Sequence, residues 1–262
     1  MKTLKKINSN TSKKKPNREA SFWLFGLHAV ESALLNAARS KLRLVVTRNA
    51  ADKLCEAIIS SGMKPELCDP KDFNSKIEKN SVHQGVALKT KPLDWGGLED
   101  HLITDSKKPA RLVLLDQITD PQNVGAILRT SEVLGVNAVI GTKRRCAPES
   151  GALAKAASGA LERQPYLKVN NLAETIKRIQ KSGYVVLGLD SLASKSLEEI
   201  LFDKNQQDLA IVLGSEGTGL RQRTKEIVDC AAKIVSMGSF GSLNVSNAAA
   251  IALYATTLNW KS

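Results

Sequence analysis

The sequence predicts an α/β protein in which a small α/β domain precedes a larger domain built on a parallel sheet. Three observations support this. From about residue 110 onward, short apolar runs alternate with helix-like segments, the pattern of a parallel sheet with helices on its faces. Residues 21–92 contain fewer and shorter runs of both kinds, which suffice for a small domain. Between them, the polar stretch 93–108 contains two glycines and indicates a linker.

In the larger domain, residues 109–262, the expected strands are the apolar runs 111–115, 138–140, 184–189, 209–213 and 233–235. The expected helices are 124–134, 152–158, 172–181, 220–228 and 246–258. The last of these carries almost no charge, so we expect it to be packed on several sides. Ser246 is its expected N-cap.

The small domain is also expected to contain both helices and strands, but fewer of them. Its expected helices are 28–38 and 51–60, the second closed by Gly62, and its expected strands are 42–47 and 86–88. Before it, residues 1–20 are rich in Lys, Asn, Ser and Thr and have little to bury, so we expect a disordered arm. This arm either contacts RNA phosphates or is a solvated tail.

Composition limits the classes of function. The 262 residues carry a net charge of +12, half of it in residues 1–20, which suggests RNA or DNA as a partner, although a merely basic enzyme remains an alternative. No apolar stretch predicts a membrane helix or a secretory signal. The three histidines lie outside the larger domain, which argues against a Ser-His-Asp hydrolase there. Four scattered cysteines argue against zinc and for a reduced cytoplasmic protein: Cys55, Cys68, Cys146 and Cys230.

Three polar segments of the larger domain have the same character. Residues 120–129, 213–221 and 242–254 each follow an apolar run and open a helix. Ligands of parallel sheets bind at the carboxyl ends of the strands, which share one edge. We therefore expect the three segments to meet and to form one active site.

The side chains of these segments exclude several chemistries. The GSEGTG run at 214–219 is followed by Leu220 and Arg221, so it is not a phosphate-binding Walker A loop. No cluster has metal-ligand spacing. Asn, Arg, Glu and Ser groups hold and orient, which suits transfer between a bound cofactor and a positioned substrate. Taken singly, Asn123 could be a helix cap, Arg129 a surface or phosphate contact and Glu216 a solvated carboxylate.

The motifs together resemble a known family. DPQNVGAILR at 120–129, GSEGTG at 214–219 and SLNVS at 242–246 are similar to the three motifs of the SpoU/TrmH branch of the SPOUT RNA methyltransferases. FGLHAV at 25–30 and HQGVA at 83–87 resemble the small N-terminal RNA-binding domain of the 23S rRNA guanosine 2′-O-methyltransferase subgroup.

This resemblance implies transfer of a methyl group from S-adenosylmethionine to a ribose 2′-hydroxyl of rRNA or tRNA. It also implies a trefoil-knotted catalytic domain and a homodimer, in which Arg129 or the arm of one subunit completes the site of the other. The implied cofactor-binding residues are Gly214, Val235, Met237 and Leu243. The implied catalytic residues are Asn123, Arg129, Glu216, Ser242 and Asn244. The sequence departs from the family at 235–237, where a proline is missing, and the following gap is one residue shorter.

Several alternatives stay open at this stage. The family assigns the activation of the hydroxyl to the arginine of the first motif, here Arg129, but a guanidinium stays protonated and is a poor base. Glu216 is the competing base. The N-terminal domain favours large-subunit rRNA as the substrate, and tRNA is the alternative. A catalytically silent RNA-binding factor for ribosome assembly is a third reading.

Overall fold

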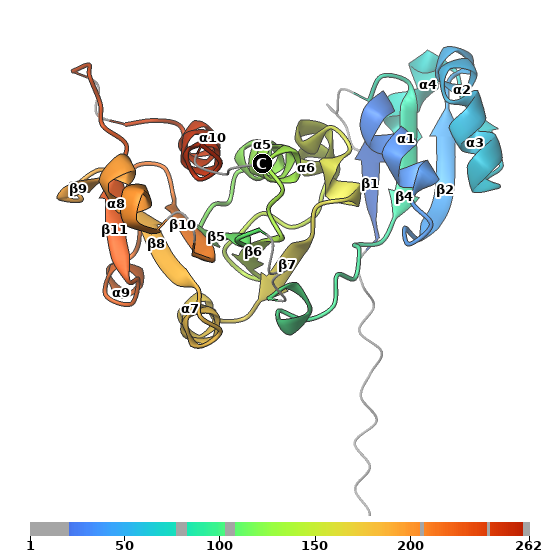
Figure 1. The fold of residues 1–262 in the computed structure, drawn as a ribbon. Coiled ribbons are helices and arrows are strands. Elements are labelled where there is room, and N and C mark those ends of the chain that lie inside the picture. The colour runs from blue at the N-terminus through green and yellow to red at the C-terminus, as the bar shows by residue number, and fades with distance from the viewer. Residues whose placement is uncertain (1–20, 77–82, 103–107, 205–206, 240–241, 259–262) are drawn as a thin grey trace, which may run out of the picture.

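The computed structural model describes residues 21–76, 83–102, 108–204, 207–239 and 242–258. The arm expected at residues 1–20 lies outside them. The described residues form a four-stranded sheet followed by a seven-stranded sheet, each with helices packed on it (Figure 1). This confirms the predicted α/β class with a small N-terminal unit, whereas the trefoil knot stays a prediction.

The small sheet has the strand order β1-β4-β2-β3, with β4 antiparallel to both β1 and β2, and β3 parallel to β2. Its strands are β1 (Phe22–Phe25), β2 (Lys41–Val46), β3 (Pro65–Leu67) and β4 (Val86–Thr90). Its helices are α1 (Leu27–Leu35), α2 (Arg48–Lys53), α3 (Cys55–Ser61) and α4 (Pro70–Lys76). The single helix expected over 51–60 is divided at Leu54, while Gly62 ends α3 in the left-handed conformation, as predicted.

The large sheet is parallel throughout, with the order β7-β6-β5-β10-β8-β11-β9. The interior strand β5 is buried along its whole length, which is why it reads as a continuous apolar run. Two short strands at the edges, β7 and β9, were not predicted. The strands are β5 (Arg111–Asp116), β6 (Ala138–Thr142), β7 (Tyr166–Val169), β8 (Val185–Leu189), β9 (Lys195–Ser196), β10 (Leu209–Gly214) and β11 (Cys230–Lys233).

Helices cover both faces of this sheet, as Figure 1 shows. One face carries α5 (Pro121–Val133), α6 (Gly151–Ala157), α8 (Leu197–Lys204) and α10 (Val245–Ala255), and the other carries α7 (Leu172–Lys181) and α9 (Gln222–Lys225). Successive side chains of β5 point to opposite faces of the sheet. Val113 and Leu115 belong to the core under α5, whereas Leu112 and Leu114 belong to the core under α7.

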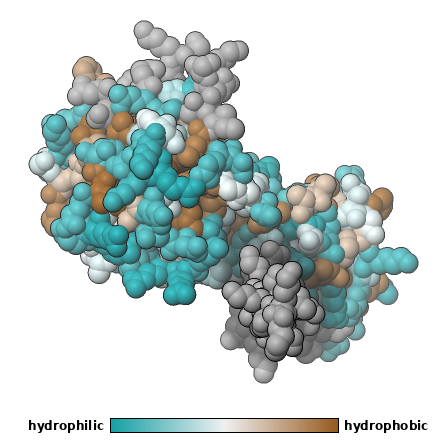
Figure 2. Space-filling view, turned by 90° about the horizontal axis from the view of Figure 1, so that it is seen from below, coloured by the Kyte–Doolittle hydropathy of each residue, from teal (hydrophilic) through white to brown (hydrophobic). Residues whose placement is uncertain are grey.

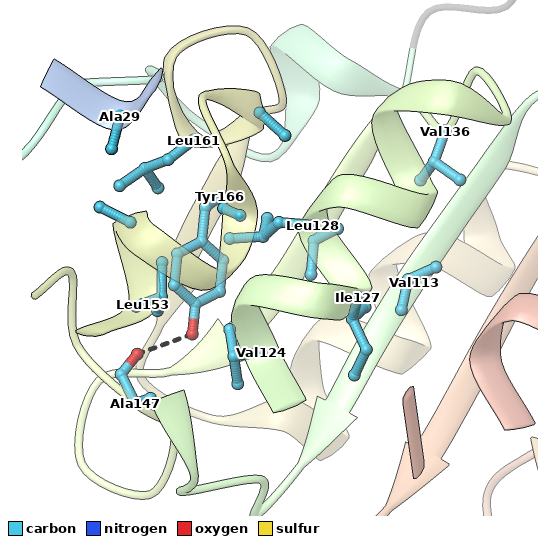
Figure 3. Close-up of a cluster of buried hydrophobic side chains, with 14 of the residues drawn as sticks. Ala29, Val113, Val124, Ile127, Leu128, Val136, Ala147, Leu153, Leu161 and Tyr166 are labelled. Atoms are coloured by element: carbon cyan, nitrogen blue, oxygen red, sulfur yellow. Dashed lines mark hydrogen bonds between the residues drawn. The ribbon is translucent and has the colours of Figure 1, made fainter. Parts of the chain in front are cut away.

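The two sheets are joined by a continuous apolar core and one buried ionic contact. Figure 3 shows Ala29 of α1 beside Leu161, in the cluster that also contains Leu128 of α5. The Arg39 guanidinium is fully buried and donates to Glu162 over 2.7 Å and to Glu149 over 3.0 Å. Part of the expected linker also packs, because Leu98 is buried in the core under α7.

The C-terminal third differs from prediction in three places. Strand β11 ends at Lys233, so the segment 233–235 is mostly beyond the strand. Helix α9 has only four residues instead of spanning 220–228. Helix α10 begins at Val245, and its N-cap is Asn244, whose side chain accepts from the Ser246 N–H. Ser246 is therefore not the cap that the sequence suggested.

Helix α10 also departs from the expectation of burial on several sides. Val245, Ala249, Ala252 and Leu253 are buried, but an apolar surface remains exposed. That surface is formed by Ile251 and Tyr254, and Leu258, just beyond the end of the helix, is exposed as well. Within the described part of the chain, no helix is long and apolar enough to cross a membrane.

Candidate active site

The site begins where two neighbouring strands end. Asp116 closes β5 and is paired in register with Gly214, which closes β10. From β5 the chain turns into α5, whose N-cap Asp120 accepts hydrogen bonds from the backbone amides of Gln122 and Asn123. The cap and the proline at the first helical position fix the first turn of α5. Asn123 is thereby held at the edge where the glycine-rich segment also leaves the sheet.

The glycine-rich segment forms a tight turn that presents Glu216. The Gly219 N–H donates to the Ser215 carbonyl over 2.9 Å, and Gly217 and Gly219 both adopt positive φ values. A Cβ on Gly214 would lie 2.2 Å from the Gly219 carbonyl carbon, so only glycine permits this closure. Glu216 lies within the turn and is exposed.

Asn123, Glu216 and Asn244 form one hydrogen-bonded cluster from three elements. The Asn123 Nδ2 donates to Glu216 Oε1 over 3.0 Å, and the Asn244 Nδ2 donates to the same oxygen over 2.6 Å. The Asn244 Nδ2 also donates to Asn123 Oδ1 over 2.9 Å. The prediction that the three segments meet is therefore confirmed, while the catalytic roles of these residues stay predictions.

Asn244 has two functions because its side-chain amide has an oxygen that accepts hydrogen bonds and a nitrogen that donates them. Its Oδ1 caps α10 by accepting from the Ser246 backbone N–H over 2.9 Å and from the Ser246 hydroxyl over 2.6 Å. Its Nδ2 is the end that joins the cluster. Helix α10 and the orientation of Glu216 thus depend on the same side chain.

Arg129 and Ser242 lie outside the cluster. Arg129 is six residues beyond Asn123 on α5, about one and two-thirds turns, so the two side chains leave the helix on different sides. Arg129 is exposed, and no hydrogen bond or salt bridge joins it to another described residue. Ser242 is exposed in the segment that precedes α10. Within one chain, the described structure therefore does not bring Arg129 to Glu216.

Three of the four expected cofactor residues lie at or just after strand ends on the same edge of the sheet, and the fourth, Leu243, lies just before α10. Gly214 ends β10, and Val235 and Met237 follow β11, with β8 between the two strands. The apolar side chains of Val235, Met237 and Leu243 are exposed to 49, 97 and 48%. Exposed apolar groups beside a glycine-rich turn suit a ligand that has both an apolar and a polar part. The residues present thus fit a nucleoside with an amino acid chain, as in S-adenosylmethionine.

An ionic contact at this edge was missed from the sequence. Asp116 is buried, and its carboxylate accepts from Arg221 Nε over 2.6 Å and from the Arg221 backbone N–H over 3.1 Å. This contact fastens the end of the glycine-rich turn to β5. The sequence signal was an acidic residue directly after a buried strand, but its partner lies 105 positions away.

The described residues hold no group of three or more His, Cys, Asp or Glu residues that could bind a metal ion. Two amides orient one carboxylate, which leaves the second carboxylate oxygen for another partner.

The chain matches two families of known proteins. Residues 110–254 match the SpoU rRNA Methylase family, and residues 23–95 match the family described as RNA 2′-O ribose methyltransferase substrate binding. A protein of Coxiella burnetii named 23S rRNA (guanosine-2′-O-)-methyltransferase RlmB is 37% identical over 88% of this chain and 93% of its own length. The protein of the same name from Escherichia coli K12 is 34% identical over 88% of this chain and 96% of its own length.

Solved structures have the same fold. An S-adenosylmethionine-bound rRNA methyltransferase of Sinorhizobium meliloti superposes with a TM-score of 0.74 at 22% identity, over 92% of this chain and 88% of its own. The SpoU methyltransferase AviRb of Streptomyces viridochromogenes, also in complex with this cofactor, gives 0.73 at 22% identity over 90 and 89%. Given the motif cluster and these matches over most of its length, the chain belongs to the SpoU rRNA methylase family.

Proposed function

We propose that this protein is an enzyme that transfers a methyl group from S-adenosylmethionine to the 2′-hydroxyl of a guanosine ribose in 23S rRNA. The observation that carries the proposal is the hydrogen-bonded cluster of Asn123, Glu216 and Asn244, because it assembles the three family motifs at one sheet edge. The names of the relatives from C. burnetii and E. coli support 23S rRNA and guanosine as substrate. An rRNA substrate supports a cytoplasmic location.

The cofactor would be held by the glycine-rich turn and the segments before α10. Gly214 lets the backbone of Gly219 approach closely, so that the turn can close, and Val235, Met237 and Leu243 offer apolar contacts. When bound, S-adenosylmethionine supplies a methyl group on a positively charged sulfur, which is already a good electrophile. What remains for the protein is to position the ribose and to remove its proton.

Glu216 is our candidate for the general base. Two amide donors, from Asn123 and Asn244, converge on Oε1, so the carboxylate is oriented while Oε2 remains for the ribose hydroxyl. A guanidinium cannot accept that proton, since it has no acceptor atom. Arg129 would instead bind the adjacent phosphate and stabilise the developing alkoxide. Ser242, two residues before Asn244, would contact the substrate or cofactor from the motif-three segment.

The same proposal includes a homodimer in which Arg129 of one subunit completes the site of the other. In its own chain, Arg129 leaves α5 on a different side from Asn123. The exposed apolar surface of α10, together with the exposed Val133 at the end of α5, offers a surface for a second copy. Helices α5 and α10 contact each other, so one interface can include both.

The test is methyl transfer from radiolabelled S-adenosylmethionine to unmodified 23S rRNA, 16S rRNA and tRNA, with Asn123→Ala as the control. We expect label in the 23S rRNA alone, mapped to a guanosine ribose, and none with the variant. Label confined to tRNA would keep the chemistry and replace the substrate. The absence of label in every pool, together with no binding of S-adenosylmethionine in calorimetry, would favour the silent RNA-binding factor.

A further inference from the structure

A cavity of about 260 Å³ opens on the face of the large sheet opposite α5 and α10. Figure 2 looks onto this face, where hydrophilic side chains predominate around α7 and α9. The cavity lies over the carboxyl ends of β6 and β7 and beside the start of α9. Its polar lining includes Thr142, Arg144, Arg145, Asn170, Arg221 and Arg223.

The positive charge of this lining is only partly compensated. Four arginines and no acidic residue line the cavity. Arg221 is paired with Asp116, but no salt bridge joins Arg144, Arg145 or Arg223 to any residue that the structure describes. A concave surface lined by charges of one sign focuses its electric field and attracts ligands of the opposite sign. The cavity therefore favours an anionic ligand.

The chemistry of the lining indicates which anion. Guanidinium groups match the geometry of phosphate oxygens and bind them by two parallel hydrogen bonds. No aromatic side chain lines the cavity, so it offers no surface on which a base could stack. The N-terminus of α7 opens here too, but Asn171 already caps its Ala173 and Glu174 amides. The arginines are thus the groups that recognise the ligand.

The cavity is connected to the active-site cluster through few residues. Arg221 binds Asp116, Asp116 lies opposite Gly214 in the β5–β10 register, and Gly214 precedes Glu216 by two positions. A chain molecule that reaches from the cluster across this sheet edge arrives at the arginines. An RNA strand is such a molecule, and it carries a phosphate at every nucleotide.

We propose that Arg144, Arg145 and Arg223 form a subsite for a backbone phosphate of the RNA substrate, next to the nucleotide that is methylated. Its placement beside the target rests on the function proposed above. The subsite positions the RNA backbone and carries no sequence information.

The test uses the variants Arg144→Gln, Arg223→Gln and their combination in the full-length protein. Binding of a fluorescein-labelled oligouridylate is measured by anisotropy over a KCl series, without cofactor. We expect the double variant to bind about ten-fold more weakly, and each substitution to lower the slope of log K against log salt by about 0.7 to 1. With 23S rRNA as methyl acceptor, KM should rise while kcat and the affinity for S-adenosylmethionine stay unchanged.

Arg163→Gln is the matched control, because it removes one positive charge from the opposite end of β7, where Arg163 is half exposed and paired with Glu132. An equal loss of RNA affinity in this control would show a general charge effect and overturn the subsite.

Unchanged salt slopes in the double variant would overturn the subsite as well, even if the wild-type protein methylates 23S rRNA. Reduced slopes without any methyl transfer would keep the subsite and overturn the proposed function. A wild-type protein that binds no oligouridylate and methylates no RNA would overturn both.

Discussion

The side-chain amide of Asn244 donates a 2.6 Å hydrogen bond to the carboxylate of Glu216, and the same amide caps helix α10 with its oxygen. The motif that follows the last strand thereby controls both the start of its own helix and the orientation of a carboxylate from another loop. A single substitution can separate these two functions, because serine is as good an N-cap as asparagine but has no amide donor.

Asn244→Ser should keep the stability of the protein and lose activity. We expect its free energy of unfolding in urea to stay within about 0.5 kcal/mol of wild type, whereas Asn244→Ala should lose about 1 kcal/mol with the cap. Both variants should methylate 23S rRNA at least about ten-fold more slowly, because Glu216 loses a donor. Full activity of the serine variant would show that this hydrogen bond is not needed for the reaction.

Glu216→Gln tests the general base. Glutamine has the same shape and still accepts from both asparagines through its amide oxygen, but it cannot take a proton. We expect kcat to fall about 10²- to 10⁴-fold and the acid limb of the pH–rate profile to disappear. Calorimetric affinity for S-adenosylmethionine should be unchanged and serves as the control. Wild-type kcat in this variant would exclude Glu216 as the base.

Mixed dimers test whether Arg129 acts across subunits. Arg129→Ala and Asn123→Ala should each be inactive alone. In a random mixture, half of the dimers contain one of each, and each such dimer has one site with both groups intact, so about a quarter of wild-type activity should return. The return is measured as methyl transfer after co-expression with two different affinity tags. Purified heterodimers without activity would place Arg129 in the site of its own subunit.

Arg39→Met should destabilise the junction between the two sheets. The substitution leaves Glu149 and Glu162 buried without their cation, which costs about 3 to 5 kcal/mol for a buried ion pair that loses one partner. Urea unfolding measures the loss. Arg163→Gln, which breaks an exposed pair with Glu132, is the control and should cost less than about 1 kcal/mol. Equal losses in the two variants would show that the Arg39 contact contributes no more than a surface pair.

Stability should also depend on pH through Lys168. Burial lowers the pKa of Lys168 from its ordinary 10.5 to about 8, and its ammonium donates to the Ala147 carbonyl over 2.6 Å. Between these pH values the unfolded chain binds more protons than the folded one. The contribution of this group is therefore fully present above pH 10.5 and is lost as the pH falls through about 8.

The comparison is with Lys168→Met, which cannot titrate. The stability of wild type relative to this variant should rise with pH, by at most about 3.4 kcal/mol, across the interval between the two pKa values. Urea unfolding at a series of pH values measures the difference. A difference that stays constant with pH would show that Lys168 keeps its ordinary pKa in the folded protein.

Most of the large sheet could be predicted because its central strands are buried on both faces. Residues 111–115 and 209–213 read as continuous apolar runs, and the structure places β5 and β10 there. Helix α7 was predicted at its observed bounds, 172–181, because its apolar residues recur with helical spacing and so form one apolar face opposite a polar one. The edge strands β7 and β9 were missed because they are short and contain lysines, which give no periodic signal.

What the sequence by itself determined is the set of three polar segments, each of which follows a strand of the large sheet, and the chemistry that their side chains exclude. The shared edge at which parallel strands have their carboxyl ends was enough to predict that the segments of Asn123, Glu216 and Asn244 meet. Only the tertiary structure decided that Arg129 leaves its helix away from them, that Asp116 holds Arg221, and that arginines from the segment after β6 and from the start of α9 line one cavity. The physical reason is that these relationships join residues far apart in the chain, and local patterns of polarity determine which elements form but not which side chains face one another once they pack.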